Sequence, residues 1–281
     1  MKICITGHCG FIGFHLWDRL REDHEIIGID LKKGKDILDM KPEDLEGVEY
    51  LFHLAARVSV SESIENPEET HKNNVTGTYH VLECARLAGV KRVIFSSSSA
   101  VYGINENHDK LGIPYNELMA LEPVSPYGLS KLIGEEYCKL YSRIYGIDTV
   151  CLRYFNVYGD RMKSDSPYSA AIAIFLDKKS KNKPLSVFGG KQTRDFVHVD
   201  DVVEANIKAM KYERIFDGQP INIGTGRDYS IEDIAKMISD NIEYFPQREH
   251  EANSSLAYIH TANRVLHWRA KYNILEWLKH V

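Results

Sequence analysis

Three residues have types and spacing that could move a proton: Ser98, Tyr127 and Lys131. Of the sixteen tyrosines, only Tyr127 is followed four residues later by a lysine, and residues at i and i+4 share one face of a helix. A tyrosine with its ordinary pKa of about 10 is a poor base at neutral pH. A neighbouring ammonium favours the phenolate, which could take a proton from a hydroxyl as hydride leaves the adjacent carbon. A Tyr–Lys pair alone is more typical of a solvated surface, so this interpretation needs support elsewhere.

A run of four serines, Ser96 to Ser99, gives that support. It follows a predicted strand at 91–95. Ligands of open parallel sheets bind at the carboxyl ends of the strands, where a serine hydroxyl could hydrogen-bond a reacting oxygen. The alternative is a polar strand end whose hydroxyls cap the chain itself, and the glycine-rich loop upstream favours the functional interpretation.

Three glycines, Gly7, Gly10 and Gly13, stand between the first predicted strand and the helix after it. In a dinucleotide-binding loop one glycine allows the tight turn, a second lets backbone approach a pyrophosphate, and a third lets helix and strand pack closely. The helix N-terminus adds free N–H groups and partial positive charge. Tight turns also collect glycine, and the Gly-x-x-Gly-x-x-Gly spacing is the less common one. The position at a strand–helix junction nevertheless predicts a dinucleotide site.

Asp30 closes the second predicted strand and indicates which dinucleotide binds. A carboxylate there can accept hydrogen bonds from the ribose hydroxyls of NAD and would repel the extra phosphate of NADP. The alternatives are a loop carboxylate with no such role and, because Lys32 and Lys33 follow, some tolerance of NADP. We predict NAD, whose positive nicotinamide would join Lys131 in favouring the Tyr127 phenolate.

The elements that must position these residues alternate between strand and helix patterns. Such alternation implies a parallel sheet covered on both faces, so we predict an α/β fold, a Rossmann-type doubly wound parallel sheet with a smaller C-terminal lobe. We place a Rossmann domain at 1–155, with a returning segment at about 190–225, and the smaller lobe mainly at 156–281. We expect strands at 2–6, 26–29, 50–53, 91–95 and 149–152, and helices at about 13–20, 74–87 and, after an N-cap at Ser125, 126–145.

The composition excludes several classes of protein. The 281 residues are 43% hydrophobic and 27% charged, with a formal net charge of −5, as in ordinary globular chains. Without a basic run, nucleic acid is not an expected partner. No apolar run approaches the ~18 residues that span a bilayer, and a strand starting next to Met1 argues against a cleaved leader. The five cysteines are scattered, without metal-ligand spacing. We therefore expect no metal site and no membrane partner, and reduced thiols in a cytoplasmic protein.

Together the motifs resemble the extended short-chain dehydrogenase/reductase family, in its nucleotide-sugar epimerase/dehydratase branch. Thr6 to Gly13 resembles the family's cofactor loop, and Tyr127 and Lys131 match its catalytic pair. The family's active hydroxyl stands four residues before the tyrosine of a Val-Tyr-Gly motif, which selects Ser98. The likeness spans nearly the whole chain, because further segments follow in the family's order at 53–56, 74–78, 153–159, 192–201 and 222–226.

This resemblance implies a set of site residues. Ser98, Tyr127 and Lys131 would be catalytic. The residues implied to contact NAD are Gly7, Gly10, Phe11, Ile12, Gly13, Asp30, Asp36, Ile37, Leu54, Ala55, Ala56, Asn73, Ser96, Tyr127, Lys131 and Tyr154. Those implied to contact a nucleotide sugar are Ser98, Tyr127, Asn156, Val187, Arg194, Arg248 and Ser255. A guanidinium suits the diphosphate because it is always charged and binds paired oxygens.

Ser99 and Ala100, directly after the active serine, bear on the type of reaction. Dehydratases of the branch carry an acidic pair there, because elimination needs an acid for the leaving hydroxyl and a base for the C5 proton, and decarboxylases usually keep a glutamate. A serine–alanine pair resembles the 4-epimerases. We predict NAD-dependent 4-epimerisation of a UDP-sugar through a transient 4-keto intermediate, with Tyr127 as the base. A 4,6-dehydratase, decarboxylase or reductase of the family, or a non-catalytic NAD-binding protein, remains an alternative.

The C-terminal part leaves the identity of the sugar and the base open. Ser255 stands near the position that limits room for a 2-acetamido group in some epimerases, so N-acetyl forms of UDP-glucose and UDP-galactose are possible substrates. The chain departs from the family pattern in a short 226–248 segment, at Tyr258 and at Asp160. The resemblance also implies a homodimer in which the helices at 74–87 and 125–145 pair across a two-fold axis.

Overall fold

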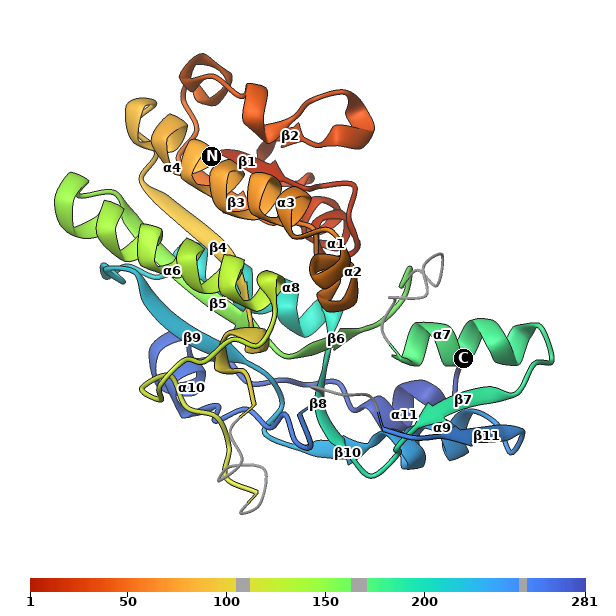
Figure 1. The fold of residues 1–281 in the computed structure, drawn as a ribbon. Coiled ribbons are helices and arrows are strands. Elements are labelled where there is room, and N and C mark those ends of the chain that lie inside the picture. Colours follow the sequence, from red (N-terminus) through yellow and green to blue (C-terminus); the bar gives the residue numbers. More distant parts are fainter. Residues whose placement is uncertain (105–111, 163–170, 248–251) are drawn as a thin grey trace.

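Six parallel strands form the central sheet of the protein (Figure 1). The computed structural model describes residues 1–104, 112–162, 171–247 and 252–281. The strands run in the order β2-β1-β3-β4-β5-β9. They are β1 (Lys2–Thr6), β2 (Glu25–Ile29), β3 (Tyr50–His53), β4 (Arg92–Ser98), β5 (Asp148–Tyr154) and β9 (Gln219–Ile223). From β1 the chain adds β2 on one side and then β3, β4 and β5 on the other. This change in the order of strands is the doubly wound arrangement, and it confirms the predicted Rossmann-type fold.

Helices cover both faces of this sheet, as its buried strands require. On one face, α1 (Phe11–Leu20) and α8 (Val199–Lys211) pack against the strands, with Leu16 and Val202 in one buried cluster. On the other face, α4 (Gly77–Leu87) and α6 (Pro126–Tyr145) share a second cluster with the sheet. The chain reaches α4 through α2 (Val60–Glu65), α3 (Pro67–Thr70) and a π-helical turn, η4 (His71–Thr76).

The predicted elements are found, with ends that differ from the predicted ones by a few residues. β4 continues through Ser98 because its last three residues pair with β5, where Ser98 lies opposite Tyr154. The helix expected at 74–87 begins earlier, in the π-helical turn η4. There the Asn74 side chain bonds the backbone of Arg57 in both directions, at 2.8 Å and 2.9 Å, and this tertiary contact is invisible in a local pattern. Short 3₁₀ turns complete this part: η1 (Leu31–Lys33), η2 (Ile37–Asp39), η3 (Pro42–Leu45) and η5 (Ser99–Tyr102).

The smaller lobe lies beyond the carboxyl edge of the sheet, in the lower part of Figure 1. It contains two small sheets, β10-β8-β6 and β11-β7, and its own apolar cluster. Its strands are β6 (Asn156–Tyr158), β7 (Leu185–Phe188), β8 (Thr193–His198), β10 (Asp228–Ser230) and β11 (Ile242–Phe245). Its helices are α7 (Ala171–Ser180), α9 (Ile231–Ile238), α10 (His260–Leu266) and α11 (Ile274–Leu278), of which α10 packs back on the main sheet.

Among the residues that the structure describes, none of the helices combines the length and the apolar character needed to cross a bilayer.

Candidate active site

The structure brings Ser98, Tyr127 and Lys131 together at the carboxyl end of β4. The backbone that carries Tyr127 is fixed twice, because Ser125 caps α6 through the Gly128 N–H at 3.1 Å and Ser63 Oγ accepts from the Tyr127 N–H at 3.1 Å. The Ser98 side chain is close enough to the Tyr127 phenol to act on its pKa, and its Oγ accepts from the Ala100 N–H at 3.1 Å. The Lys131 ammonium lies 5.9 Å from the centre of the Tyr127 ring.

Without a bound cofactor, the pKa of Tyr127 shifts in the opposite direction to the one expected from the sequence. Burial raises the pKa of Tyr127, and the nearby Ser98 hydroxyl offsets only part of that rise. Burial also lowers the pKa of Lys131 to about 7, while Nζ donates to the Ser96 carbonyl at 2.7 Å. A group poised near neutrality in this way is typical of functional sites. A phenolate at this position therefore needs positive charge beyond that of the side chains.

The loop before α1 has the geometry of a phosphate cradle. Gly7 has a φ of +72°, and a Cβ there would lie 2.7 Å from the Ala55 nitrogen, so only glycine fits. A Cβ on Gly13 would lie 2.2 Å from the Gly7 carbonyl oxygen, which explains the close helix–strand packing. No side chain caps the N-terminus of α1 and no acidic residue stands in its first turn. The N–H groups of Phe11, Ile12 and Gly13 are thus available to an anion.

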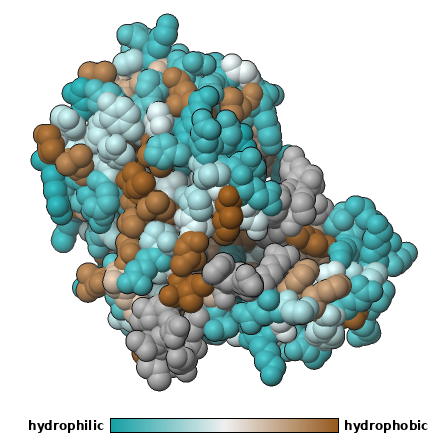
Figure 2. All heavy atoms as spheres, viewed as in Figure 1, coloured by the Kyte–Doolittle hydropathy of each residue, from teal (hydrophilic) through white to brown (hydrophobic). Residues whose placement is uncertain are grey.

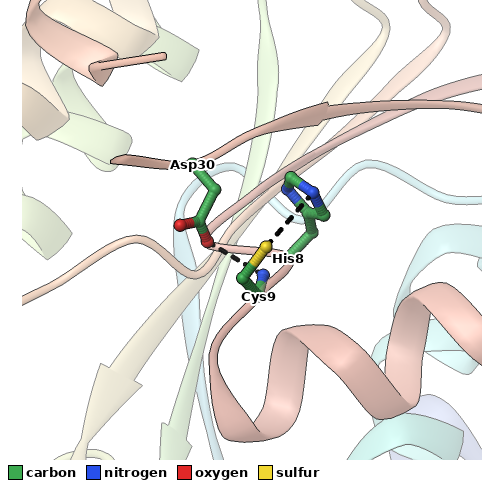
Figure 3. Close-up of side chains that lie close together, drawn as sticks. All are labelled: His8, Cys9 and Asp30. Carbon is green, nitrogen blue, oxygen red and sulfur yellow. Dashed lines mark hydrogen bonds between the residues drawn. The ribbon is translucent and has the colours of Figure 1, made fainter. Parts of the chain in front are cut away.

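Asp30 lies beside this loop, where β2 ends (Figure 3). One carboxylate oxygen accepts from the Cys9 N–H at 2.8 Å and the other from the Lys32 N–H at 2.9 Å. These bonds fix the carboxylate, and each oxygen keeps a further acceptor position. The side chain can therefore accept hydrogen bonds from a pair of ribose hydroxyls.

Other residues expected at the dinucleotide also border this region. Leu54, Ala55 and Ala56 leave β3 beside Gly7, and the Ala55 N–H donates to Thr6 Oγ1 at 3.2 Å. Asn73 offers an enclosed Oδ1 that has no hydrogen-bond partner within the described residues. Asp36 caps η2 through the Leu38 N–H. An orphaned, enclosed acceptor of this kind fits a bound ligand, because buried polar atoms normally have partners.

Three of the expected contact residues turn their side chains into the core instead. Ile37 is 3% exposed and packs on Gly77. Tyr154 donates its hydroxyl to Asn206 at 2.9 Å. Val187 is fully buried in the smaller lobe. For these residues a ligand could meet only backbone or the edge of a ring, and their assignment as contacts stays a prediction.

Sequence reasoning missed a buried ion pair beneath the catalytic residues. Glu135 lies one turn after Lys131 on α6, and its carboxylate binds Arg153 of β5 through two bonds of 2.8 Å and 2.6 Å. The same carboxylate accepts from Ser97 Oγ at 2.5 Å. Tyr127, Lys131 and Glu135 follow the i, i+4, i+8 spacing of one helix face, a signal that could have placed Glu135 on the catalytic face but not its partner Arg153.

A match to a known family accompanies this geometry. The model of the NAD dependent epimerase/dehydratase family matches residues 3–224. The chain belongs to this family. Membership in the NAD dependent epimerase/dehydratase family confirms the resemblance. The prediction of an NAD-dependent enzyme of the nucleotide-sugar 4-epimerase type, with NAD as its cofactor, is confirmed at the level of the family.

Individual members of the family are similar over almost their full length. A putative UDP-glucose 4-epimerase of Methanocaldococcus jannaschii is 37% identical, covering 99% of this chain and 96% of that protein. A UDP-N-acetylglucosamine 4-epimerase structure from Methanobrevibacter ruminantium, in complex with UDP-N-acetylmuramic acid, is 31% identical with a TM-score of 0.92 over 99% of this chain and 96% of that one. A UDP-glucuronic acid 4-epimerase from Bacillus cereus, in complex with UDP-glucuronic acid and NAD, is 30% identical with a TM-score of 0.90 over 99% and 97%.

Several residues expected to contact the nucleotide sugar lie close together around β6 and β8. Asn156 Nδ2 donates to the Asp195 carbonyl at 3.0 Å and to Ser255 Oγ at 3.4 Å. Arg194, next along β8, donates to the Thr193 carbonyl at 2.8 Å. Arg248 lies outside the described residues. The structure thus places Asn156, Arg194 and Ser255 on neighbouring segments, although they are far apart in sequence.

Asp195 organises this region, a role that sequence reasoning did not assign. Its buried carboxylate accepts from Thr225 and Gly226 N–H groups at 2.8 Å and 2.9 Å, and from the Ala257 N–H at 3.2 Å. Burial raises its pKa to about 6, against the effect of these hydrogen bonds. One side chain therefore joins the turn after β9 and the 255–257 segment to β8.

Proposed function

We propose that the chain catalyses 4-epimerisation of a UDP-sugar, with Tyr127 as the residue that moves the proton. The observation that carries the proposal is that Ser98, Tyr127 and Lys131 lie together at the sheet edge. In the sequence, Ser99 and Ala100 follow the active serine directly. Neither of these two side chains could supply the acid and base of an elimination. This feature favours epimerisation over 4,6-dehydration. Because neither position holds the glutamate that decarboxylases usually keep there, it also disfavours decarboxylation.

The chain's own residues would act on the sugar O4 and its proton. Tyr127 takes the proton from O4 and later returns it, and Ser98, which lies close to the Tyr127 phenol, holds the reacting oxygen. Lys131, anchored by the Ser96 carbonyl, favours the phenolate when protonated. The Gly7–Gly13 loop and Asp30 would hold NAD, which when bound would supply reversible hydride acceptance. Tyr127 thus contributes general acid–base catalysis, worth about 10²–10⁴-fold in rate.

We further propose that N-acetyl sugars are accepted. Ser255 is small, partly buried and within 3.4 Å of Asn156, so it leaves room beside the sugar. The similar structures include proteins named for UDP-N-acetylglucosamine and for UDP-glucuronic acid, which supports a pocket tolerant of groups at C2 or C5. Asn156 and Arg194, with Arg248, would bind the diphosphate part.

Incubation of the purified protein with UDP-, dTDP- and GDP-sugars, followed by NMR, tests this function. We expect the C4 epimer of a UDP-sugar, with no net NADH formed. Tyr127→Phe should lower kcat by about 10²–10⁴-fold while NAD binding is retained. A 4-keto-6-deoxy product, loss of carbon dioxide or net NADH would instead establish one of the alternative activities, and full activity in Tyr127→Phe would rule out the assigned base.

We also propose that two copies associate through α4 and α6. Both helices bury one face in the second core cluster, yet each also exposes large apolar side chains, including Tyr79 and Leu87 on α4 and Leu140 and Ile144 on α6. Figure 2 shows hydrophobic residues at the surface on the side where Figure 1 places these helices. The division into 1–155, with a return near 190–225, and 156–281 likewise remains a proposal.

A further inference from the structure

A histidine, a cysteine and an aspartate converge beside the dinucleotide loop. His8 and Cys9 lie between Gly7 and Gly10, and Asp30 follows β2. One potential ligand atom from each lies within 4.8 Å of the other two. His8 and Cys9 are partly exposed, while Asp30 is 9% exposed. Figure 3 shows the three side chains turned toward one another, with the sulfur between the carboxylate and the imidazole.

The distance between the sulfur and the imidazole suits a zinc ion. Cys9 Sγ lies 3.5 Å from His8 Nε2. Zinc bonds of about 2.3 Å to sulfur and about 2.0–2.1 Å to nitrogen separate the two ligand atoms by about 3.5 Å at a tetrahedral angle. A thiol–imidazole hydrogen bond has the same length, so this distance does not carry the inference alone.

The His8 imidazole is held in place by packing but makes few hydrogen bonds to the described residues. A Cβ on Gly28 would lie 2.5 Å from the His8 ring, so the sheet leaves room for the ring only because this residue is glycine. Trp17 packs on the ring at 4.9 Å between centroids. His8 Nδ1 is enclosed without a hydrogen-bond partner in the described part of the chain. A ring positioned so firmly, with one contact to sulfur, has the pre-organisation of a ligand.

From these observations we infer that His8, Cys9 and Asp30 form a zinc site that excludes the dinucleotide. On binding, the Cys9 thiol releases its proton to solvent and bonds the metal as thiolate, while neutral His8 and ionised Asp30 complete three protein ligands. Thiolate and carboxylate together neutralise the divalent charge, and water takes the fourth position. The exclusion rests on the proposed role of Asp30 at the ribose, since one carboxylate cannot serve both ligands fully. Zinc would then act as an inhibitor that competes with NAD.

The site itself is tested without an activity assay. The nucleotide-free full chain is titrated with Co²⁺, a spectroscopic substitute for zinc, and the near-ultraviolet absorption from a thiolate–cobalt bond is followed. We expect saturation at one equivalent, displacement by Zn²⁺ and loss of the band in Cys9→Ser. His8→Asn should weaken binding about tenfold or more. His24→Asn is the matched control, because its Nδ1 is also enclosed and unpartnered within the described residues, but it lies outside the cluster.

Two results overturn the site: absence of the thiolate band in the wild type, or its persistence in Cys9→Ser. Competition is measured separately, by adding NAD to the cobalt complex and by equilibrium dialysis of NAD with and without Zn²⁺. We expect the apparent Kd of NAD to rise in proportion to the Zn²⁺ concentration once the metal site is filled, and the apparent Kd of the metal to rise likewise with NAD. If NAD binds and leaves the metal affinity unchanged, the competitive inhibition is refuted. If NAD does not bind at all, the proposed function fails, while the cobalt titration still decides the site.

Discussion

At Lys131, the proposed role in catalysis conflicts with the stability of the folded protein. It is 3% exposed, and among the described residues Nζ has one hydrogen-bond acceptor, the Ser96 carbonyl, although an ammonium has three donors. Burial lowers its pKa to about 7, against the raising effect of nearby Glu135. A group kept for chemistry in such surroundings costs stability in its charged form.

We expect Lys131→Met to stabilise the protein measured without added NAD while it lowers kcat. The folded pKa, about 7, lies below the ordinary value of 10.5. Between these values the unfolded chain binds more protons, so wild-type stability falls as pH falls from about 10.5 to about 7. The shift corresponds to at most about 5 kcal/mol. The gain from Met should therefore be largest near pH 7, at about 1–5 kcal/mol, and shrink toward pH 10.

Urea unfolding at pH 7 and pH 9.5, with circular dichroism as the readout, checks this prediction. Lys183→Met, at an exposed position, should change the free energy of unfolding by less than about 0.5 kcal/mol at both pH values. A Lys131→Met protein that is no more stable than wild type at pH 7, or whose gain grows with pH, contradicts the argument.

At the scale of elements, α6 and β5 are joined by the Glu135–Arg153 pair. The two side chains are 0% and 1% exposed, and Arg153 also donates to the Tyr102 hydroxyl at 2.9 Å. That hydroxyl in turn donates to Asn222 Oδ1 of β9 at 2.7 Å. The network thus connects the catalytic helix with two strands. Loss of one charge would leave the other buried and unpaired, which is far more costly than loss of an exposed pair.

Glu135→Gln should accordingly lower the free energy of unfolding by about 3–5 kcal/mol. The neighbouring Glu136 is the matched control, because it pairs with Lys139 at 2.6 Å but is 60% exposed. Glu136→Gln should change stability by less than about 1 kcal/mol. Urea titrations of both variants at one pH and one protein concentration make the comparison. Equal effects of the two substitutions would refute a dominant role for the buried pair.

At the scale of the whole molecule, the proposed dimer predicts which surface substitutions alter the molecular mass. A charge at Leu140 or Ile144 of α6, which are 45% and 62% exposed, would be buried at the interface without a partner. Leu140→Asp together with Ile144→Asp should therefore convert dimer to monomer in light scattering coupled to size exclusion.

Ile215→Asp is the control for this experiment. Ile215 is 78% exposed and lies outside both helices, so its charge should leave the mass unchanged. A monomeric wild type, or a double variant that remains dimeric, would exclude this interface.

The sequence predicted the local order of elements well because their signals are local. Alternating strand and helix patterns defined β1 to β5, and Ser125 with Pro126 marked the start of α6. The ends of β4 and the π-helical turn before α4 were not predicted, since they depend on pairing with Tyr154 and on the bonds between Asn74 and Arg57.

The same distinction holds for the site. The Gly7–Gly13 loop and the Tyr127–Lys131 pair are determined by the sequence alone, because backbone freedom and helical spacing act over a few residues. Only the tertiary structure placed Glu135 against Arg153, and Ser255 beside Asn156. It also brought Asp30 to His8 and Cys9, across 21 residues, through the parallel pairing of β1 with β2. No spacing rule contains such contacts, because they arise where separate elements meet.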